Sequence, residues 1–261
     1  MICFKIDKLT VEIFPTRLIM GQNAAKDVSE KIKELLLEKD EINMMFAAAP
    51  SQNEFLSTLI SDKSIPWERI NAFHMDEYIG LDKNAPQAFG NFLKQTIFDR
   101  VPFKNVYYID GMATDYQSEC NRYARLLTDR IIDIVCLGIG ENGHIAFNDP
   151  HVADFKDRHV MKVVNLDMDC RQQQVNDGCF NNLEEVPKQA YTLTIPILLS
   201  ASSMFCVVPG STKRNAIYNT INMPVDEKYP ATILRDKEGA ILYIDMESGS
   251  LLKLDKHMEK I

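Results

Sequence analysis

Short apolar runs alternate along this chain with longer stretches in which apolar residues recur at helical spacing. The apolar runs are typical of buried strands and cover residues 3–14, 42–49, 70–74, 106–109, 132–137, 191–194, 204–208 and 240–244. The helical spacing predicts helices over residues 20–37, 52–60, 88–98 and 115–128. Strands that alternate with helices in this way predict an α/β fold, with a mostly parallel, doubly wound (Rossmann-like) sheet and helices on both faces.

One stretch departs from this alternation. Residues 155–179 are irregular, charged and rich in glutamine and asparagine, so we expect either a segment that covers a ligand or a simple surface excursion. No linker-like stretch, low-complexity segment or internal repeat divides the chain. Its 261 residues are ample for one sizeable core, and the prediction is a single domain over residues 1–261.

The most informative run is residues 132–150, where a strand-like segment breaks into glycines. Glycine at positions 138, 140 and 143 lets the backbone turn tightly and approach a ligand closely. Asn142, His144 and Asp149 lie among and after these glycines. In an open α/β sheet, ligands bind beyond the carboxyl ends of the strands. A histidine and a carboxylate at such a strand end indicate proton transfer.

Asp76 occupies a second strand end, in the run Met75-Asp76-Glu77-Tyr78. An aspartate in this position is often only a turn or capping residue, and the pattern alone does not separate that role from a catalytic one. Apolar neighbours would desolvate the carboxylate and raise its pKa toward the operating pH, as a general base requires. Glu77 is expected to be an ordinary solvated side chain.

Two further strand ends carry groups that bind anions. Residues 47–53 join a strand to a helix, with Ser51 as the expected helix N-cap and Gln52 beside it. An ordinary capped helix explains this run as well as a phosphate site does. Residues 210–213 combine a glycine turn, two hydroxyls and a cation, and Lys213 offers a point charge to a phosphate.

Three of these motifs, in this order and spacing, resemble the signatures of one enzyme family. They are Phe-His-Met-Asp-Glu-Tyr-Ile-Gly-Leu at residues 73–81, Gly-Ile-Gly-Glu-Asn-Gly-His-Ile-Ala-Phe-Asn-Asp-Pro at residues 138–150, and Gly-Ser-Thr-Lys at residues 210–213. The chain thus resembles the isomerising glucosamine-6-phosphate deaminases, relatives of the 6-phosphogluconolactonases, over most of its length. The resemblance implies an enzyme that converts a 2-amino-2-deoxyhexose 6-phosphate to a ketose 6-phosphate plus ammonia, without a cofactor.

The resemblance also implies roles for single residues. Asp76 matches the base that moves a proton from C2 to C1 of the opened sugar, and His144 matches the acid/base that opens the ring. Asn142 and Asp149 stand where the family usually has aspartate and glutamate, and both are expected to assist His144. For the phosphate, Lys213 matches the family's lysine. The arginine that the family also uses has a single nearby candidate, Arg171, and Ser51 and Gln52 occupy the place of the family's first phosphate-binding turn.

Three functions remain open at this point. The first is the deaminase, with glucosamine 6-phosphate or galactosamine 6-phosphate as substrate. The second is a sugar-phosphate lactonase, in which His144 activates water for attack on an ester and Asp76 is not needed. The third is a non-catalytic sugar-phosphate sensor, in which Asn142 and Asp149 are signs of lost chemistry.

Composition narrows the partners and the compartment. The formal net charge of −8 argues against general binding to nucleic acid or to an acidic membrane, but it allows a small sugar phosphate in a local positive pocket. Six cysteines are scattered without paired spacing and no apolar leader is visible, so we expect a cytoplasmic protein. No cluster of histidine, cysteine and aspartate has metal-ligand spacing, so no metal is expected. A homo-oligomer is compatible with the sequence.

Overall fold

An eight-stranded sheet forms the centre of the computed structural model, which describes residues 1–253. Residues 254–261 of the predicted domain lie outside the described part of the chain. In sheet order the strands are β1 (Ile2–Ile6), β2 (Leu9–Phe14), β11 (Ala240–Asp245), β10 (Ser203–Val208), β7 (Ile134–Leu137), β3 (Ile42–Phe46), β4 (Ile70–His74) and β6 (Asn105–Tyr107). Every neighbouring pair is parallel except β1 and β2, which form a hairpin, so the predicted sheet is confirmed.

Helices cover both faces of this sheet. They are α1 (Arg17–Glu38), α2 (Asn53–Leu59), α3 (Phe89–Leu93), α4 (Tyr116–Thr128), α5 (Met168–Asn176), α6 (Ile195–Leu199) and α7 (Arg214–Asn222). In β7, Ile134 and Cys136 pack into one apolar cluster with α1 and α2, whereas Val135 and Leu137 pack into a second cluster with α4. A strand that is buried on both faces appears in the sequence as a continuous apolar run, which is why the pattern predicted it.

Five shorter helical turns join these elements. They are η1 (Pro50–Gln52), η2 (Trp67–Arg69), the π-helical η3 (Lys94–Phe98), η4 (Ser211–Lys213) and η5 (Pro230–Asp236). The helix predicted over residues 88–98 therefore consists of α3 followed by a π-helical turn. Among the described helices, none is long and apolar enough to cross a membrane.

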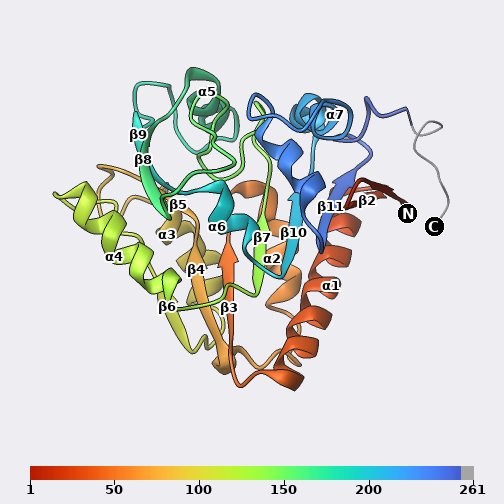
Figure 1. The fold of residues 1–261 in the computed structure, drawn as a ribbon, viewed down its shortest axis with the longest axis horizontal. Helices are drawn as coiled ribbons and strands as arrows, with labels where there is room; N and C mark the ends of the chain where they lie inside the picture. The colour runs from red at the N-terminus through yellow and green to blue at the C-terminus, as the bar shows by residue number, and fades with distance from the viewer. Residues whose placement is uncertain (254–261) are drawn as a thin grey trace.

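A small antiparallel sheet lies at the carboxyl end of β4. Its strands, in order, are β5 (Asp76–Tyr78), β9 (Gln189–Leu193) and β8 (Met161–Asn165). One residue, Met75, separates β4 from β5, so the chain runs directly from the large sheet into the small one. Figure 1 shows α5 and α7 at the top, beyond the same end of the large sheet. The motifs singled out in the sequence meet at this end.

The prediction that residues 155–179 are irregular is wrong, because this stretch contains β8 and α5. Asp167 caps α5, and its carboxylate accepts a hydrogen bond from the N–H of Cys170 at 2.6 Å. The buried positions of the helix include Arg171, Gln173 and Gln174. The helix therefore turns polar side chains inward and has no apolar stripe that a sequence pattern could detect.

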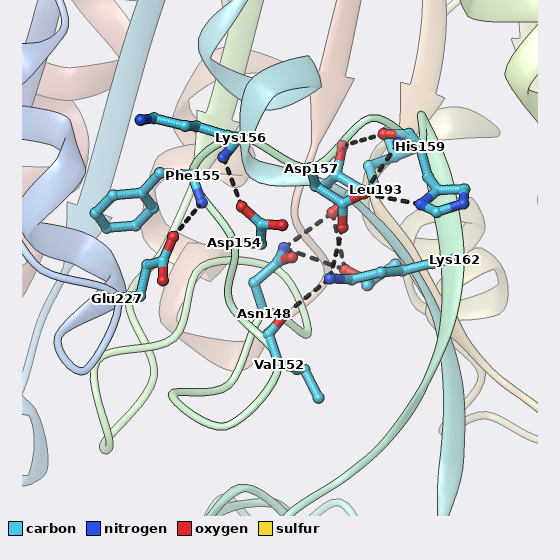
Figure 2. A network of polar contacts seen from close by, with 12 residues as sticks. Asn148, Val152, Asp154, Phe155, Lys156, Asp157, His159, Lys162, Leu193 and Glu227 are labelled. Atoms are coloured by element: carbon cyan, nitrogen blue, oxygen red, sulfur yellow. Dashed lines mark hydrogen bonds and ion pairs between the residues drawn. The ribbon is translucent and has the colours of Figure 1, made fainter.

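Polar contacts fix the segment between β7 and β8 (Figure 2). The ammonium of Lys162 donates to the carbonyl of Val152 at 2.7 Å and pairs with the carboxylate of Asp157 at 2.8 Å. On the other side, the carboxylate of Glu227 accepts a hydrogen bond from the N–H of Phe155 at 2.9 Å. The segment is thus tied to β8 and to the loop that precedes η5.

Candidate active site

Four of the predicted site residues line one cavity at the carboxyl end of the large sheet. Asp76 comes from β5, His144 from the loop after β7, Ser51 from η1 and Lys213 from η4. The cavity has a volume of about 60 Å³. Other lining residues include Phe89, Gly138, Gly140, Phe147, Gln173 and Gln174. Parallel strands end at the same edge of a sheet, and this brings together motifs that lie far apart in the sequence.

The carboxylate of Asp76 is buried and poorly solvated. The residue is 6% exposed, and its Oδ1 atom has no hydrogen-bond partner among the described residues. Burial raises the pKa of Asp76 well above its usual value, and the charge of the neighbouring Glu77 raises it further. A carboxylate with a raised pKa is a stronger base, so this setting suits the abstraction of a proton from carbon.

A histidine at the end of β4 fixes the backbone beside Asp76. The Nδ1 atom of His74 lies 2.9 Å from the carbonyl oxygen of Asp76, and its Nε2 atom accepts a hydrogen bond from the N–H of Ile109 at 2.9 Å. This pairing requires the neutral ring with its hydrogen on Nδ1. Burial lowers the pKa of His74 to about 4, so the ring keeps this form at neutral pH. The sequence pattern gave His74 only as a strand residue.

Glu77 is buried, contrary to the expectation of a solvated side chain. It is 4% exposed and accepts three backbone hydrogen bonds, from Tyr78 and Phe89 at 2.9 Å and from Gly90 at 2.8 Å. Burial raises the pKa of Glu77 to about 7, although these three bonds oppose the rise. The side chain therefore ties the start of α3 to β5, and it sets the electrostatic environment of Asp76.

We expect the substitution Glu77→Gln to shift the pH dependence of catalysis. Loss of the neighbouring charge lowers the pKa of Asp76, so the acidic limb of the kcat/KM profile moves to lower pH. The new amide also turns a donor toward one of the three backbone N–H groups, which costs about 1–3 kcal/mol of unfolding free energy. The exposed Glu68→Gln is the control for both measurements. An acidic limb that stays in place would contradict the electrostatic role.

The imidazole of His144 is oriented through one ring nitrogen. Its Nδ1 atom lies 2.8 Å from Oδ1 of Asn142 and 3.1 Å from Oδ1 of Asp149. Both oxygens are acceptors, so Nδ1 carries the hydrogen. The Nε2 atom makes no hydrogen bond with the described residues, and the side chain lines the cavity. His144 is therefore placed to exchange a proton through Nε2.

Asn142 joins His144 to two carboxylates. Its Oδ1 atom accepts from the backbone N–H of His144 at 3.0 Å, while its Nδ2 atom donates to Asp149 and Asp167, both at 3.0 Å. Burial by itself would raise the pKa of Asp149, but the bonds from His144 and Asn142 outweigh it, and the net pKa is lowered. Asp149 is consequently charged and can stabilise a protonated His144. An amide is needed at position 142 because a carboxylate has no hydrogen to donate.

Gly140 leaves room for the ring of His144. A Cβ atom added at this position would lie 2.1 Å from Cε1 and 2.3 Å from Nε2 of the imidazole. We expect Gly140→Ala to displace the ring and to lower kcat/KM about 100-fold, since a shift of about 1 Å has an effect of this order. Steady-state kinetics, with the unfolding midpoint measured on the same variant, check this. A wild-type kcat/KM would show that the ring is not held against position 140.

Lys213 is the cation of the cavity. The residue is 5% exposed, and its ammonium forms no ion pair within residues 1–253. Burial lowers the pKa of Lys213, while the carboxylates of Asp177 and Glu141 oppose the change. Gly210 begins the turn with a φ of 91°, and its N–H donates to the carboxylate of Asp245 at 3.1 Å. An unpaired buried ammonium suits an anionic ligand such as a phosphate.

Ser51 lines the cavity but caps no helix, which corrects the expectation. Pro50 begins the turn η1, so Ser51 lies inside that turn, and its Oγ atom accepts a hydrogen bond from the amide of Gln52 at 3.1 Å. Helix α2 then starts at Asn53 without a side-chain cap. The hydroxyl hydrogen of Ser51 is left to donate to a ligand.

Gln52 and Arg171 are not among the residues that line the cavity. Gln52 donates to the carbonyl of Val207 at 3.0 Å and so holds η1 against β10. The guanidinium of Arg171 donates to the carbonyls of Leu183 at 2.5 Å and Val186 at 2.9 Å. Backbone carbonyls thus take the hydrogen bonds that we expected a phosphate to take. Both side chains support the walls of the site instead.

Sequence reasoning missed two side chains of α5 that do line the cavity, Gln173 and Gln174. The Oε1 atom of Gln173 accepts a hydrogen bond from the N–H of Glu141 at 2.8 Å, which ties α5 to the glycine-rich loop. The one signal in the sequence was a run of three glutamines at residues 172–174. A polar run is normally solvated, so the pattern gave no reason to place it in a site.

Side chains that could hold a metal ion also meet here. The ligand atoms of His144, Asp149 and Cys170 lie within 4.8 Å of one another, as do those of Asp149, His151 and Asp167. Spacing along the chain did not reveal these groups, because α5 and the loop after β7 contribute to both. Burial raises the pKa of the Cys170 thiol well above its usual value, which opposes the thiolate that a metal needs. The chemistry of the donor set therefore favours proton transfer.

Known proteins with similar sequences are aminosugar-phosphate enzymes. A family model described as glucosamine-6-phosphate isomerases/6-phosphogluconolactonase matches residues 15–243. The glucosamine-6-phosphate deaminase of Listeria monocytogenes serotype 4a is 32% identical over 234 residues, which cover 90% of this chain and 96% of that protein. The glucosamine-6-phosphate deaminase of Halalkalibacterium halodurans is 30% identical over 232 residues, which cover 85% and 92%.

Solved structures share the fold. A monomeric glucosamine-6-phosphate deaminase matches with a TM-score of 0.84 and 28% identity, covering 93% of this chain and 99% of that one. The 6-phosphogluconolactonase of Thermotoga maritima matches with a TM-score of 0.74 and 21% identity, covering 91% and 100%. The second likeness concerns the fold alone.

Proposed function

Because the chain belongs to the family of glucosamine-6-phosphate isomerases and 6-phosphogluconolactonases, we propose that it is an aminosugar-phosphate deaminase. The resemblance inferred from its motifs is confirmed at the level of the family. The proposed reaction converts a 2-amino-2-deoxyhexose 6-phosphate, glucosamine 6-phosphate first, to a ketose 6-phosphate and ammonia. One observation carries this proposal: Asp76 and His144, from distant parts of the chain, line one cavity with the unpaired cation Lys213.

Binding begins with the phosphate. The ammonium of Lys213 supplies the positive charge, and the hydroxyl of Ser51 supplies a neutral donor. Gln52 holds the turn that carries Ser51, so it positions this group without a contact of its own. A phosphate fixed at one end of the sugar holds C1 and C2 near the two proton-transfer groups, and such positioning removes much of the entropic barrier.

Ring opening uses His144. Its Nε2 atom takes the proton of the anomeric hydroxyl and delivers a proton to the ring oxygen as the C1–O5 bond breaks. The imidazolium that forms in between is stabilised by the carboxylate of Asp149, 3.1 Å from Nδ1, and by the oxygen of Asn142. An open-chain aldehyde results.

Isomerisation and deamination use Asp76. Its carboxylate removes the C2 proton from the aldehyde and returns a proton to C1, which leaves an imine at C2. Water adds to the imine carbon, and the C2–N bond then breaks. Ammonia leaves and C2 becomes the ketone, so the reaction consumes one water and needs no change of oxidation state overall.

A lactonase is the second candidate, because a free Nε2 atom of His144 in the cavity also suits attack by water on an ester. A lactonase leaves the buried base Asp76 without a task, and burial of an unpaired carboxylate is costly. The proposal therefore favours the deaminase.

An ammonia-release assay over several sugars tests the proposal. The panel contains glucosamine 6-phosphate, galactosamine 6-phosphate and unphosphorylated glucosamine, with 6-phosphogluconolactone hydrolysis as the control reaction. We expect ammonia from at least one of the two phosphorylated sugars, little from glucosamine, and no lactone hydrolysis above background. Lactone hydrolysis without ammonia release would establish the second candidate, and binding of the sugar phosphates without either reaction would indicate a sensor.

The setting of the enzyme follows from its chemistry. We place it in the cytoplasm, because all six cysteines are free and a reducing compartment preserves thiols. We treat residues 1–261 as one domain with a small sugar phosphate as its partner. A homo-oligomer is compatible with the chain, and one similar solved deaminase is described as monomeric.

A further inference from the structure

We infer that Gln174 contacts the substrate and reads a hydroxyl of the sugar chain, an inference that rests on the proposed function. Gln174 lies on α5, is 7% exposed, and lines the cavity of Asp76 and His144. Its side-chain amide has no hydrogen bond to any residue among 1–253. Buried polar groups are nearly always paired, so an unpaired amide that faces a cavity indicates a ligand.

Gln174 also marks the boundary between the cavity and a neighbouring recess. The recess has a volume of about 290 Å³ and shares Ala48, Ala49, Phe89 and Gln174 with the cavity. The cavity alone, at about 60 Å³, is much smaller than the roughly 300 Å³ at which small-molecule sites begin. A hexose phosphate that reaches Lys213, His144 and Asp76 therefore needs part of the recess, and its chain passes Gln174.

The three consecutive glutamines of α5 have three different roles. Gln172 is exposed and bonds within the helix to Asn176 at 3.1 Å. Gln173 is paired on both atoms of its amide, with the N–H of Glu141 at 2.8 Å and the carboxylate of Asp177 at 3.3 Å. Gln174 alone of the three is both buried and unpaired.

The chemistry of the amide selects the group that it contacts. A hydroxyl donates one hydrogen bond and accepts others, and a primary amide matches it in both directions. A phosphate calls for a cation, and Lys213 already supplies one. Because the hydroxyls of epimeric sugars point in different directions, the same amide contributes to the choice between the gluco and galacto substrates.

Steady-state ammonia release by Gln174→Ala, with Gln172→Ala as the matched control, tests the inference. Both variants and the wild type are assayed with glucosamine 6-phosphate and galactosamine 6-phosphate. Loss of one neutral hydrogen bond lowers kcat/KM for the preferred epimer about 10-fold. The ratio between the two epimers moves toward one, and Gln172→Ala changes neither value. The inhibition constant of inorganic phosphate stays at the wild-type value in both variants.

The outcomes separate the inference from the proposed function. Unchanged kcat/KM and an unchanged epimer ratio in Gln174→Ala overturn the inference. A rise in the inhibition constant of phosphate overturns the hydroxyl assignment, since it places the amide at the phosphate. Failure of the wild type to release ammonia from either sugar defeats the proposed function itself. Gln174→Met, which keeps the length of the side chain, replaces the alanine variant if that variant does not fold.

Discussion

Replacing Asp76 with asparagine is expected to lower kcat for ammonia release by about 10²- to 10⁴-fold and, at the same time, to stabilise the fold. The rate falls because an amide cannot take the C2 proton, and a positioned general base contributes a factor of this size. The fold gains stability because the carboxylate is buried, its Oδ1 atom has no partner among the described residues, and a neutral amide is less costly to bury. A lactonase would keep most of its activity.

The stabilisation by Asp76→Asn has a definite pH dependence. Folding raises the pKa of Asp76, so the folded state resists the loss of a proton that the unfolded chain gives up readily. The native aspartate therefore becomes destabilising as the pH rises above its ordinary pKa. The gain on substitution should be absent at about pH 4 and present at about pH 8, as measured by urea unfolding. The exposed Asp129→Asn is the control and should change neither rate nor stability.

Asn142→Asp, which restores the residue usual in the family, is expected to destabilise this protein by about 3 kcal/mol at neutral pH. The amide of Asn142 donates to Asp149 and Asp167, both at 3.0 Å. A carboxylate in its place would put a third negative charge against two others with no hydrogen between them. The new group has a raised pKa, so the loss should shrink as the pH falls and the group is protonated.

The double variant Asn142→Asp/Asp167→Asn is the test that isolates this effect. It moves the amide to the other side of the same contact, so one donor again stands between two carboxylates. An asparagine also serves as the N-cap of α5, because its oxygen can accept from the N–H of Cys170 as Asp167 does. Unfolding by urea should show that the second substitution recovers most of the stability lost to the first. Additive losses would mean that the two positions are not coupled.

The sheet and the pair Asp76 and His144 could be predicted from the sequence, for one physical reason. Strands that are buried on both faces must be apolar throughout, so they stand out, and the polar residues that follow them lie at one edge of the sheet. The glycines around His144 added a second signal. Gly140 is required because the imidazole occupies the space of its missing Cβ atom.

The remainder of the site depends on contacts that local patterns do not encode. Helix α5 buries glutamines rather than apolar residues, so it resembled a surface segment. Glu77 is buried because three backbone N–H groups from β5 and the start of α3 converge on it, and that convergence appears only in the folded chain. Arg171 looked like a phosphate ligand by its charge, yet two carbonyls of the following loop bind it.

The account's central claim is that Asp76 and His144 act on the same sugar within one cavity, the first moving a proton between C2 and C1. Turnover of glucosamine 6-phosphate in ²H₂O, with the product examined by NMR, tests this most directly. The account predicts solvent deuterium at C1 of the ketose 6-phosphate made by the wild type, and neither labelled product nor exchange at C2 with Asp76→Asn. A ketose product without deuterium at C1, or one labelled equally by the variant, would contradict it.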